Sequence, residues 1–222
     1  MKKILLTISA VVIAGCSSAP PTIQVGPNAE VSYDGLHAID NARFNLAWAD
    51  PDIDFSKYNK IIAGGAFLEF RAVKEMSKTR AMSSYSEFYI SDENKEQLRE
   101  ETTTIFREEM AKSTRFTMVE EPGPDVLIIS GGLHDIVSNV PPEPTGSSHI
   151  YLTSVGEMSL ILEAADSRSN EVIFRAVERR AAESQSGQIG RATTITNWAD
   201  IRRLLRLWAT TLREGLDSIP EA

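Results

Sequence analysis

Long apolar, strand-forming segments are the feature that most constrains the fold of this chain. They cover residues 57–70, 115–121, 126–140 and 158–176, and a turn at 166–170 makes the last of them a hairpin. Two further segments, residues 92–113 and 198–219, have a helical period instead. The order β-α-β-β-β-β-α predicts an α+β fold, a two-layer sandwich in which two helices pack on one face of a mostly antiparallel sheet.

Signals at the helix ends support this order of elements. Ser91 and Asp92 can cap the first helix, because their side-chain oxygens accept the free N–H groups of its first turn. Asn197, with Asp200 three residues later, resembles a capping box at the start of the second helix, and Pro220 is expected to end it. An apolar stripe on the second helix is expected to pack on the sheet; it consists of Trp198, Ile201, Leu205, Trp208, Leu212, Leu216 and Ile219.

The N-terminus has the pattern of a targeting signal. Two lysines are followed by the apolar residues 4–14 and then by a small residue before Cys16, the only cysteine of the chain. The apolar run would span about 16 Å as a helix, about half of a hydrocarbon core, so a signal peptide is favoured over a membrane-spanning helix. The sequence Val12-Ile-Ala-Gly-Cys16 resembles the bacterial lipobox. That resemblance implies a signal peptide at residues 1–15 and a lipid attached to Cys16.

The lipid on Cys16 would hold the protein at a membrane. Residues 16–32 are expected to form the lipidated cysteine and a flexible tether, because prolines are frequent there, and residues 33–222 to form one domain. Ser17 follows the cysteine, and by resemblance to Gram-negative lipoproteins this implies the outer membrane. We therefore expect a lipoprotein anchored in the cell outer membrane and facing the periplasm, and several acyl chains make such an anchor effectively permanent.

Charge and motifs exclude several classes of function. The formal net charge is −8, which disfavours binding to nucleic acid. None of the three histidines has a second ligand at the spacing of a metalloenzyme motif, and the chain has no GxSxG, phosphate-loop or GxGxxG sequence. We expect no metal, no cofactor and no enzymatic activity.

A few charged residues near the predicted helix interface are candidates for a site. Glu109 falls on the apolar face of its helix, either as a partner in an ion pair or as a site residue with a raised pKa. Arg202, Arg206 and Arg213 flank the stripe of the second helix. They either lie over the edge of the sheet or, together with Glu109, form a binding surface for lipid phosphates or an acidic partner.

Larger parts of the chain resemble a known family. Its most specific pieces are the approach Pro51–Tyr58, the turn Gly123–Leu127, the strand opening Gly156-Glu-Met and the pair Trp208-Ala209. Together, the matching segments between Gly35 and Asp217 resemble a lipoprotein family of Gram-negative bacteria that is known as domain of unknown function 3313 (DUF3313). The resemblance implies an outer-membrane lipoprotein without assigned activity, and it implies no role for any residue.

Three functions follow as hypotheses. The first is a binding, accessory or structural component of an envelope assembly, with an unidentified envelope protein as its partner and the membrane bound through Cys16. The alternative is a carrier or sensor of a small apolar or lipidic ligand, held between sheet and helices, with the proline-rich loop 141–154 as its lid. A less favoured third is a hydrolase that uses Glu109 or Asp135 with His134, which requires these side chains to share one cleft. An ordered apolar cavity would favour the carrier, and a filled core with an open sheet edge would favour the assembly component.

Overall fold

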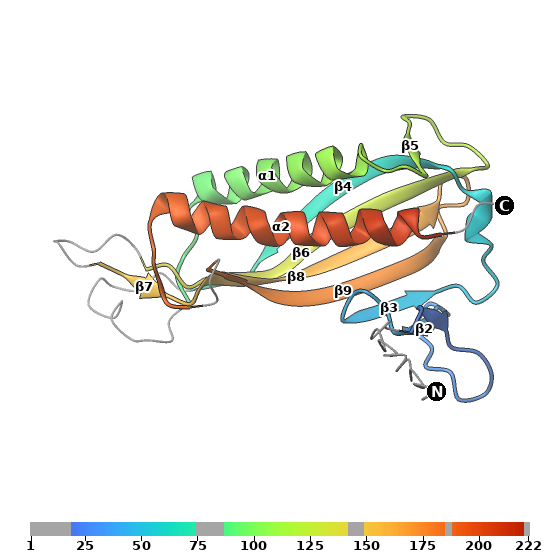
Figure 1. Ribbon diagram of the computed structural model, residues 1–222, viewed down its shortest axis with the longest axis horizontal. Helices are drawn as coiled ribbons and strands as arrows, with labels where there is room; N and C mark the ends of the chain where they lie inside the picture. Colours follow the sequence, from blue (N-terminus) through green and yellow to red (C-terminus); the bar gives the residue numbers. More distant parts are fainter. Residues whose placement is uncertain (1–18, 74–86, 142–148, 185–187, 220–222) are drawn as a thin grey trace, which may run out of the picture.

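The computed structural model describes residues 19–73, 87–141, 149–184 and 188–219, and Figure 1 shows their arrangement. A large sheet forms one layer of the molecule, and both helices lie on the same face of it. The predicted α+β fold with two helices on one face of a mostly antiparallel sheet is therefore confirmed. None of the helices in these ranges is long and apolar enough to span a membrane.

The main sheet has eight strands in the order β1-β2-β3-β9-β8-β6-β4-β5. Their bounds are Thr22–Ile23 (β1), His37–Asp40 (β2), Leu46–Ala49 (β3), Lys60–Phe70 (β4), Thr117–Met118 (β5), Val126–Ser138 (β6), Ser154–Asp166 (β8) and Val172–Glu183 (β9). Neighbours pair antiparallel, except that β4 is parallel to both β5 and β6. Parallel strands need a long crossover between them, and α1 is that crossover, because it follows β4 and precedes β5 and β6 in the chain.

One of the two helices begins where the sequence predicts, and the other does not. The helix α1 (Asp92–Met110) begins as predicted, because the Ser91 side chain accepts a hydrogen bond from the backbone N–H of Asn94. The helix α2 (Thr194–Asp217) begins earlier than predicted, so Asn197 lies within it and the predicted capping box is wrong. The Asn197 Oδ1 atom is buried without a hydrogen-bond partner in the described part of the chain.

The N-terminal segment differs most from the prediction. Two residues of the expected tether are part of the sheet, because Thr22 and Ile23 pair with Asp40 and Ile39. The strand β3 in turn pairs with β9. Strands of two to four residues are too short to show a two-residue period, so the sequence pattern could not identify them. A separate two-stranded sheet, β7 (Tyr151–Leu152) with β10 (Gly190–Arg191), was not predicted either.

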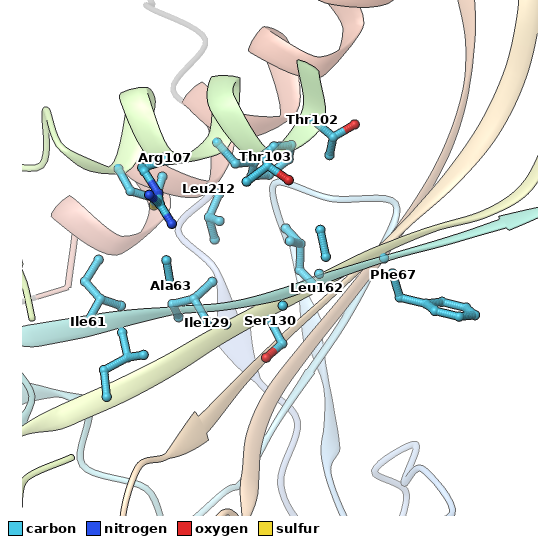
Figure 2. Close-up of a pocket in the computed structure, with 18 of the residues that line it drawn as sticks. Ile61, Ala63, Phe67, Thr102, Thr103, Arg107, Ile129, Ser130, Leu162 and Leu212 are labelled. Atoms are coloured by element: carbon cyan, nitrogen blue, oxygen red, sulfur yellow. The ribbon is translucent and has the colours of Figure 1, made fainter. Parts of the chain in front are cut away.

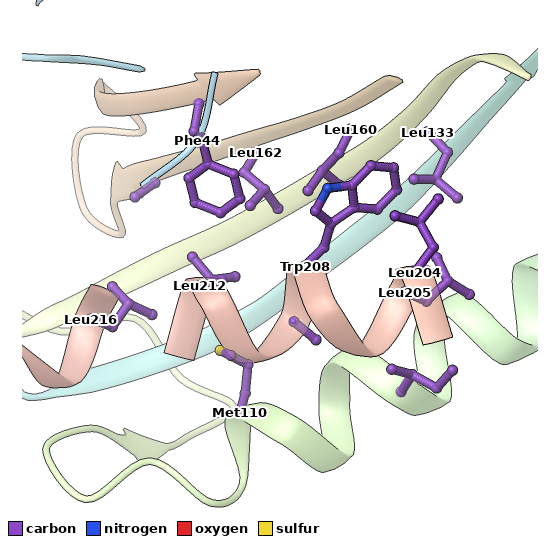
Figure 3. Close-up of a cluster of buried hydrophobic side chains, with 14 of the residues drawn as sticks. Phe44, Met110, Leu133, Leu160, Leu162, Leu204, Leu205, Trp208, Leu212 and Leu216 are labelled. Carbon is purple, nitrogen blue, oxygen red and sulfur yellow. The ribbon is translucent and has the colours of Figure 1, made fainter. Parts of the chain in front are cut away.

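The core lies between α2 and the sheet. Figure 3 shows Trp208 at its centre, with its indole ring among leucine side chains of the strands, while Leu212 and Leu216 point from α2 toward Phe44. Trp208 is 1% exposed and Leu205 is 0% exposed. Burial of such side chains contributes about 1.5–3 kcal/mol each, so α2 is held mainly by this stripe, as its sequence predicts.

Candidate ligand-binding site

An apolar cavity of about 700 Å³ lies at the C-terminal end of α2. Its volume falls within the range of about 300–1,000 Å³ that is typical of small-molecule sites. Residues of four regions enclose it: the N-terminal segment, the β2–β3 region, the centre of the sheet and α2. The apolar lining residues are Pro20, Pro21, Ile23, Ile39, Ala42, Phe44, Ala47, Ala49, Phe55, Leu127, Ile129, Leu162, Ala164, Phe174, Leu212, Leu216 and Ile219.

The folded N-terminus is what creates this cavity. The strands β6 and β8 present apolar side chains to the helix face along their whole length, because alternate residues share a face. The β2–β3 hairpin carries Ala47, and the loop between its strands carries Phe44, next to the part of that face that lies at the C-terminal end of α2. Small side chains at Ala42, Ala47 and Ala49 leave space between hairpin and helix that larger side chains would fill.

Polar groups lie among the lining residues at a few positions only. Arg43 contributes a guanidinium, and its Nη1 lies 3.7 Å from Oε2 of Glu214. Asp54 contributes a carboxylate, whose pKa is lowered chiefly by a hydrogen bond from the Ser56 side chain. A site with this lining accepts a ligand that is mostly apolar and has a small polar part.

A second, smaller cleft of about 90 Å³ lies between α1 and the strands β4 and β6. Figure 2 shows Thr103 and Arg107 on the α1 side of it, with Ala63 and Ile129 on the strands below. The cleft is close to the glycine pair of β4, where a Cβ on Gly64 would come within 2.3 Å of the Ser130 hydroxyl. Only glycine therefore fits at position 64 without a shift of its neighbours.

The loop 141–154 was expected to be a lid, and residues 142–148 of it lie outside the described residues. Its first residue, Pro141, lines a different pocket together with Asn197 and Trp198, at the N-terminal end of α2. The large cavity is lined by the opposite end of that helix, from Leu212 on. The expectation that the loop is a lid stays a prediction.

Glu109 is an ion-pair residue between the two helices. Its Oε2 lies 2.5 Å from Lys112 Nζ, and its Oε1 lies 3.0 Å from Arg213 Nε and 3.2 Å from Thr210 Oγ1. The hydrogen bond from Lys112 is the main cause that lowers the pKa of Glu109, the bonds from Arg213 and Thr210 act in the same direction, and burial opposes them. The alternative of a site carboxyl with a raised pKa is therefore wrong.

Two of the three candidate arginines join the helices in the same way. Arg202 pairs with Glu101 of α1, which raises the pKa of Arg202, and Arg213 pairs with Asp217 at 3.2 Å in addition to Glu109. Arg206 is exposed. The predicted surface of Glu109 and three arginines thus holds α1 against α2, with Arg206 as its exposed member.

The hydrolase hypothesis places its residues on two sides of the sheet. Leu133 points into the core, so its neighbour His134 points to the face away from the helices, where its ring lies 5.2 Å from that of Phe67. The His134 Nδ1 pairs with Glu69, and Asp135 pairs with Arg71 and Arg179. Glu109 lies between the helices, on the other side of the sheet. Glu109 therefore does not share a cleft with His134 or Asp135.

No group of three or more metal-ligating side chains occurs in the described ranges.

The cavity itself could not be predicted from the sequence, because its lining comes from segments far apart in the chain and each residue resembles an ordinary core residue. The signal that existed was indirect: three alanines, at positions 42, 47 and 49, stand among the larger residues Phe44, Leu46 and Trp48.

Comparison with known proteins identifies a family. A family model described as "Protein of unknown function (DUF3313)" matches residues 28–212. No protein with a curated description matches the chain.

Several solved structures share part of the architecture at very low sequence identity. One is the hypothetical protein CT253 from Chlamydia trachomatis, with 9% identity over 73% of this chain and 99% of that chain, and a TM-score of 0.38. Another is XCC0632 from Xanthomonas campestris, of family DUF330, with 11% identity over 78% and 89% and a TM-score of 0.36. A third is the PelC dodecamer from Paraburkholderia phytofirmans, with 8% identity over 70% and 89% and a TM-score of 0.35. Likenesses this distant carry no argument about function.

Proposed function

Because the chain belongs to the DUF3313 family, for which no activity is defined, we propose its function from its own geometry: it is a carrier or sensor of a small apolar ligand. The single observation that carries the proposal is the apolar cavity of about 700 Å³ between sheet and α2. Apolar side chains line the cavity, and they lack packing contacts wherever no partner atoms face them. A ligand that fills the cavity would recover the lost contacts.

The proposal includes the setting of the cavity. The lipobox around Cys16 supports a lipid anchor in the outer membrane with the domain facing the periplasm. An apolar ligand is concentrated in a membrane, so a binding protein held at the membrane surface meets it there. The role we propose is binding and not catalysis.

The cavity can be tested by filling it. Ala47 is 6% exposed and lines the cavity, whereas its neighbour Leu46 lies on the other side of β3 and is 52% exposed. We expect Ala47→Phe to lower the affinity for the neutral apolar fluorophore N-phenyl-1-naphthylamine at least about 10-fold, because the new ring occupies the void. The measurement is a fluorescence titration of the full chain, and Ala164→Phe repeats it from β8.

Leu46→Phe is the matched control, since it adds a ring on the same strand outside the cavity. Its affinity should equal that of the unchanged protein. Fluorophore binding that survives both Ala47→Phe and Ala164→Phe in folded protein would show that the fluorophore binds elsewhere, and the carrier proposal would then be lost.

A second candidate, a component of an envelope assembly, is supported by one open strand edge. β5 pairs with β4 only at Lys60 and Ile61, so the rest of this edge of β4 has no strand partner in the described part of the chain. An extended strand of a partner protein could add there by backbone hydrogen bonds.

A further inference from the structure

The large cavity and the smaller cleft follow one another along the same two strands. On β6, Leu127 and Ile129 line the cavity, and residues from Ile129 to Leu133 line the cleft. The strand β8 repeats this order, with Ala164 at the cavity and Leu160 at the cleft. At about 3.3 Å per strand residue, the stretch from Leu127 to Leu133 is about 20 Å long. The space beneath the helices is therefore long in the direction of the strands.

A single layer of three side chains separates the two spaces. Ile129, Leu162 and Leu212 line both of them. Figures 2 and 3 show Leu212 pointing from α2 toward the strands that carry the other two residues. Leu162 is 2% exposed and Leu212 is 5% exposed, and Ile129 is partly buried. We refer to these three residues as the partition.

The three side chains of the partition are apolar, and the polar residues of the cavity lie outside it. They are Arg43, Asp54, Ser56, Glu163 and Ser218. A ligand that matches has one polar end and an unbranched apolar remainder. A compact ring system would not follow the line of the two spaces.

We propose, as a refinement that rests on the proposed function, that the cavity holds one fatty acyl chain, with its polar end beside Arg43 and its length limited by the partition. Each methylene that the cavity buries should raise the affinity about fourfold, until the chain reaches Leu212. Removal of the Leu212 side chain joins cavity and cleft. The site then takes longer chains, whose ends reach the α1 side.

Two sources could supply this chemistry. One is a separate fatty acid or lipid from the membrane. The other is the protein's own anchor, because Pro20 lines the cavity and Cys16 precedes it by four residues, a reach of about 14 Å. In both cases the occupant is an acyl chain, and the experiment separates the two sources.

The experiment maps where the end of the chain lies. The full chain, in vesicles of phosphatidylethanolamine and phosphatidylglycerol, is irradiated with fatty acids that carry a diazirine at the last carbon. The acids have about 12 to 20 carbons, so that the longest exceed the chain length that the cavity is expected to accept. Labelled peptides are identified by mass spectrometry. In the unchanged protein we expect the longer acids to label the segments of the partition. In Leu212→Ala the longest acids should label α1 near Phe106, which lines the cleft.

Leu204→Ala is the matched control, because Leu204 is also 5% exposed on α2 but lines neither space. Its labelling should equal that of the unchanged protein. The same shift of labelling toward α1 in Leu204→Ala, or no shift in folded Leu212→Ala, would overturn the proposal that the partition limits the length of the bound chain. Labelling outside both spaces, while N-phenyl-1-naphthylamine still binds the cavity, would overturn the proposal that the occupant is an acyl chain and would leave the proposed carrier function intact. If neither labelling of the two spaces nor binding of the fluorophore is observed, the proposed function is wrong as well.

The second arm identifies the source. The same diazirine fatty acid is fed to the producing cells, so that it enters the lipid on Cys16. A cross-link from Cys16 to cavity residues of the same chain identifies the protein's own anchor as the occupant. Labelling by added acid alone identifies a separate lipid.

Discussion

At the scale of single residues, Asp135 has the most distinctive environment. It has a left-handed backbone with φ of 53° and pairs with Arg71, the residue after β4, and with Arg179 of β9, and Arg179 also pairs with Glu157 at 3.0 Å. The hydrogen bond from Arg71 is the main cause that lowers the pKa of Asp135 to about 2. A carboxyl with a lowered pKa stabilises the fold above its unfolded pKa of about 4, and this stability is lost as the pH falls toward 2.

Asp135→Asn should therefore change the response to acid. Asparagine tolerates the left-handed backbone but carries no charge, so the substitution leaves the shape and removes the attraction. We expect the variant to be less stable at pH 6 by about 1 kcal/mol or less, since the group is well exposed and screened by water, and the difference should shrink between pH 4 and pH 2. Urea unfolding at several pH values measures this.

Asp52→Asn is the control for this prediction, because Asp52 is an exposed aspartate outside the ion-pair cluster. Its stability should follow that of the unchanged protein. A constant difference between Asp135→Asn and the unchanged protein from pH 6 to pH 2 would contradict the assigned role of the Asp135 charge.

At the scale of elements, the β6–β8 pairing depends on one close approach. The pairing is irregular between His134 and Val137, and opposite this irregularity a Cβ on Gly156 would lie 2.3 Å from the carbonyl oxygen of Val137. Backbone atoms of a central strand cannot give way as a flexible side chain can. Only glycine fits at this place.

We expect Gly156→Ala to destabilise the protein by about 1–3 kcal/mol, because the methyl group forces the two strands apart. Gly65→Ala is the matched control: nothing lies within 4 Å of a Cβ there, so its effect should stay within about 0.5 kcal/mol. Thermal and urea unfolding compare the two. Equal effects would show that backbone freedom, and not the contact with Val137, decides the cost.

The elements also show how far the sequence could predict this structure. The long strands and α1 were predictable, because Ser91 caps the helix and the apolar residues of β8 alternate over a long run. The strands β1 to β3 were not, because pairing and not their own pattern makes them strands: β3 pairs with β9, β2 with β3, and β1 with β2. Asn197 had the local signal of a cap, but α2 continues through it. The cavity depends on contacts between distant segments, which no local pattern records.

At the scale of the whole molecule, the proposed membrane anchor at Cys16 precedes Pro20 and Pro21 of the cavity wall by only a few residues. We expect protein extracted from its own membranes to have the mass of the chain from Cys16 with its acyl groups, and Cys16→Ser to lack them and leave the membrane fraction. Native mass spectrometry of the extract measures this. The signal at residues 1–15 would be absent from the processed form.

The same spectrum bears on both candidate functions. A small apolar mass retained with the chain supports the carrier, and a second protein in fixed proportion supports the assembly component. An unmodified Cys16 in the extracted protein would contradict the anchor and, with it, the localisation to the outer membrane.

The pairing of β3 with β9 also sets an order of assembly. Leu46 lies opposite Val177, so the N-terminal strands must wait for a partner that follows roughly 130 residues later in the chain. In the proposed export, the N-terminal residues therefore emerge first and join the sheet last. The wall of the cavity that contains Phe44 and Ala47 closes only when the rest of the fold exists, and an apolar molecule that is present during this wait can be enclosed as the protein folds.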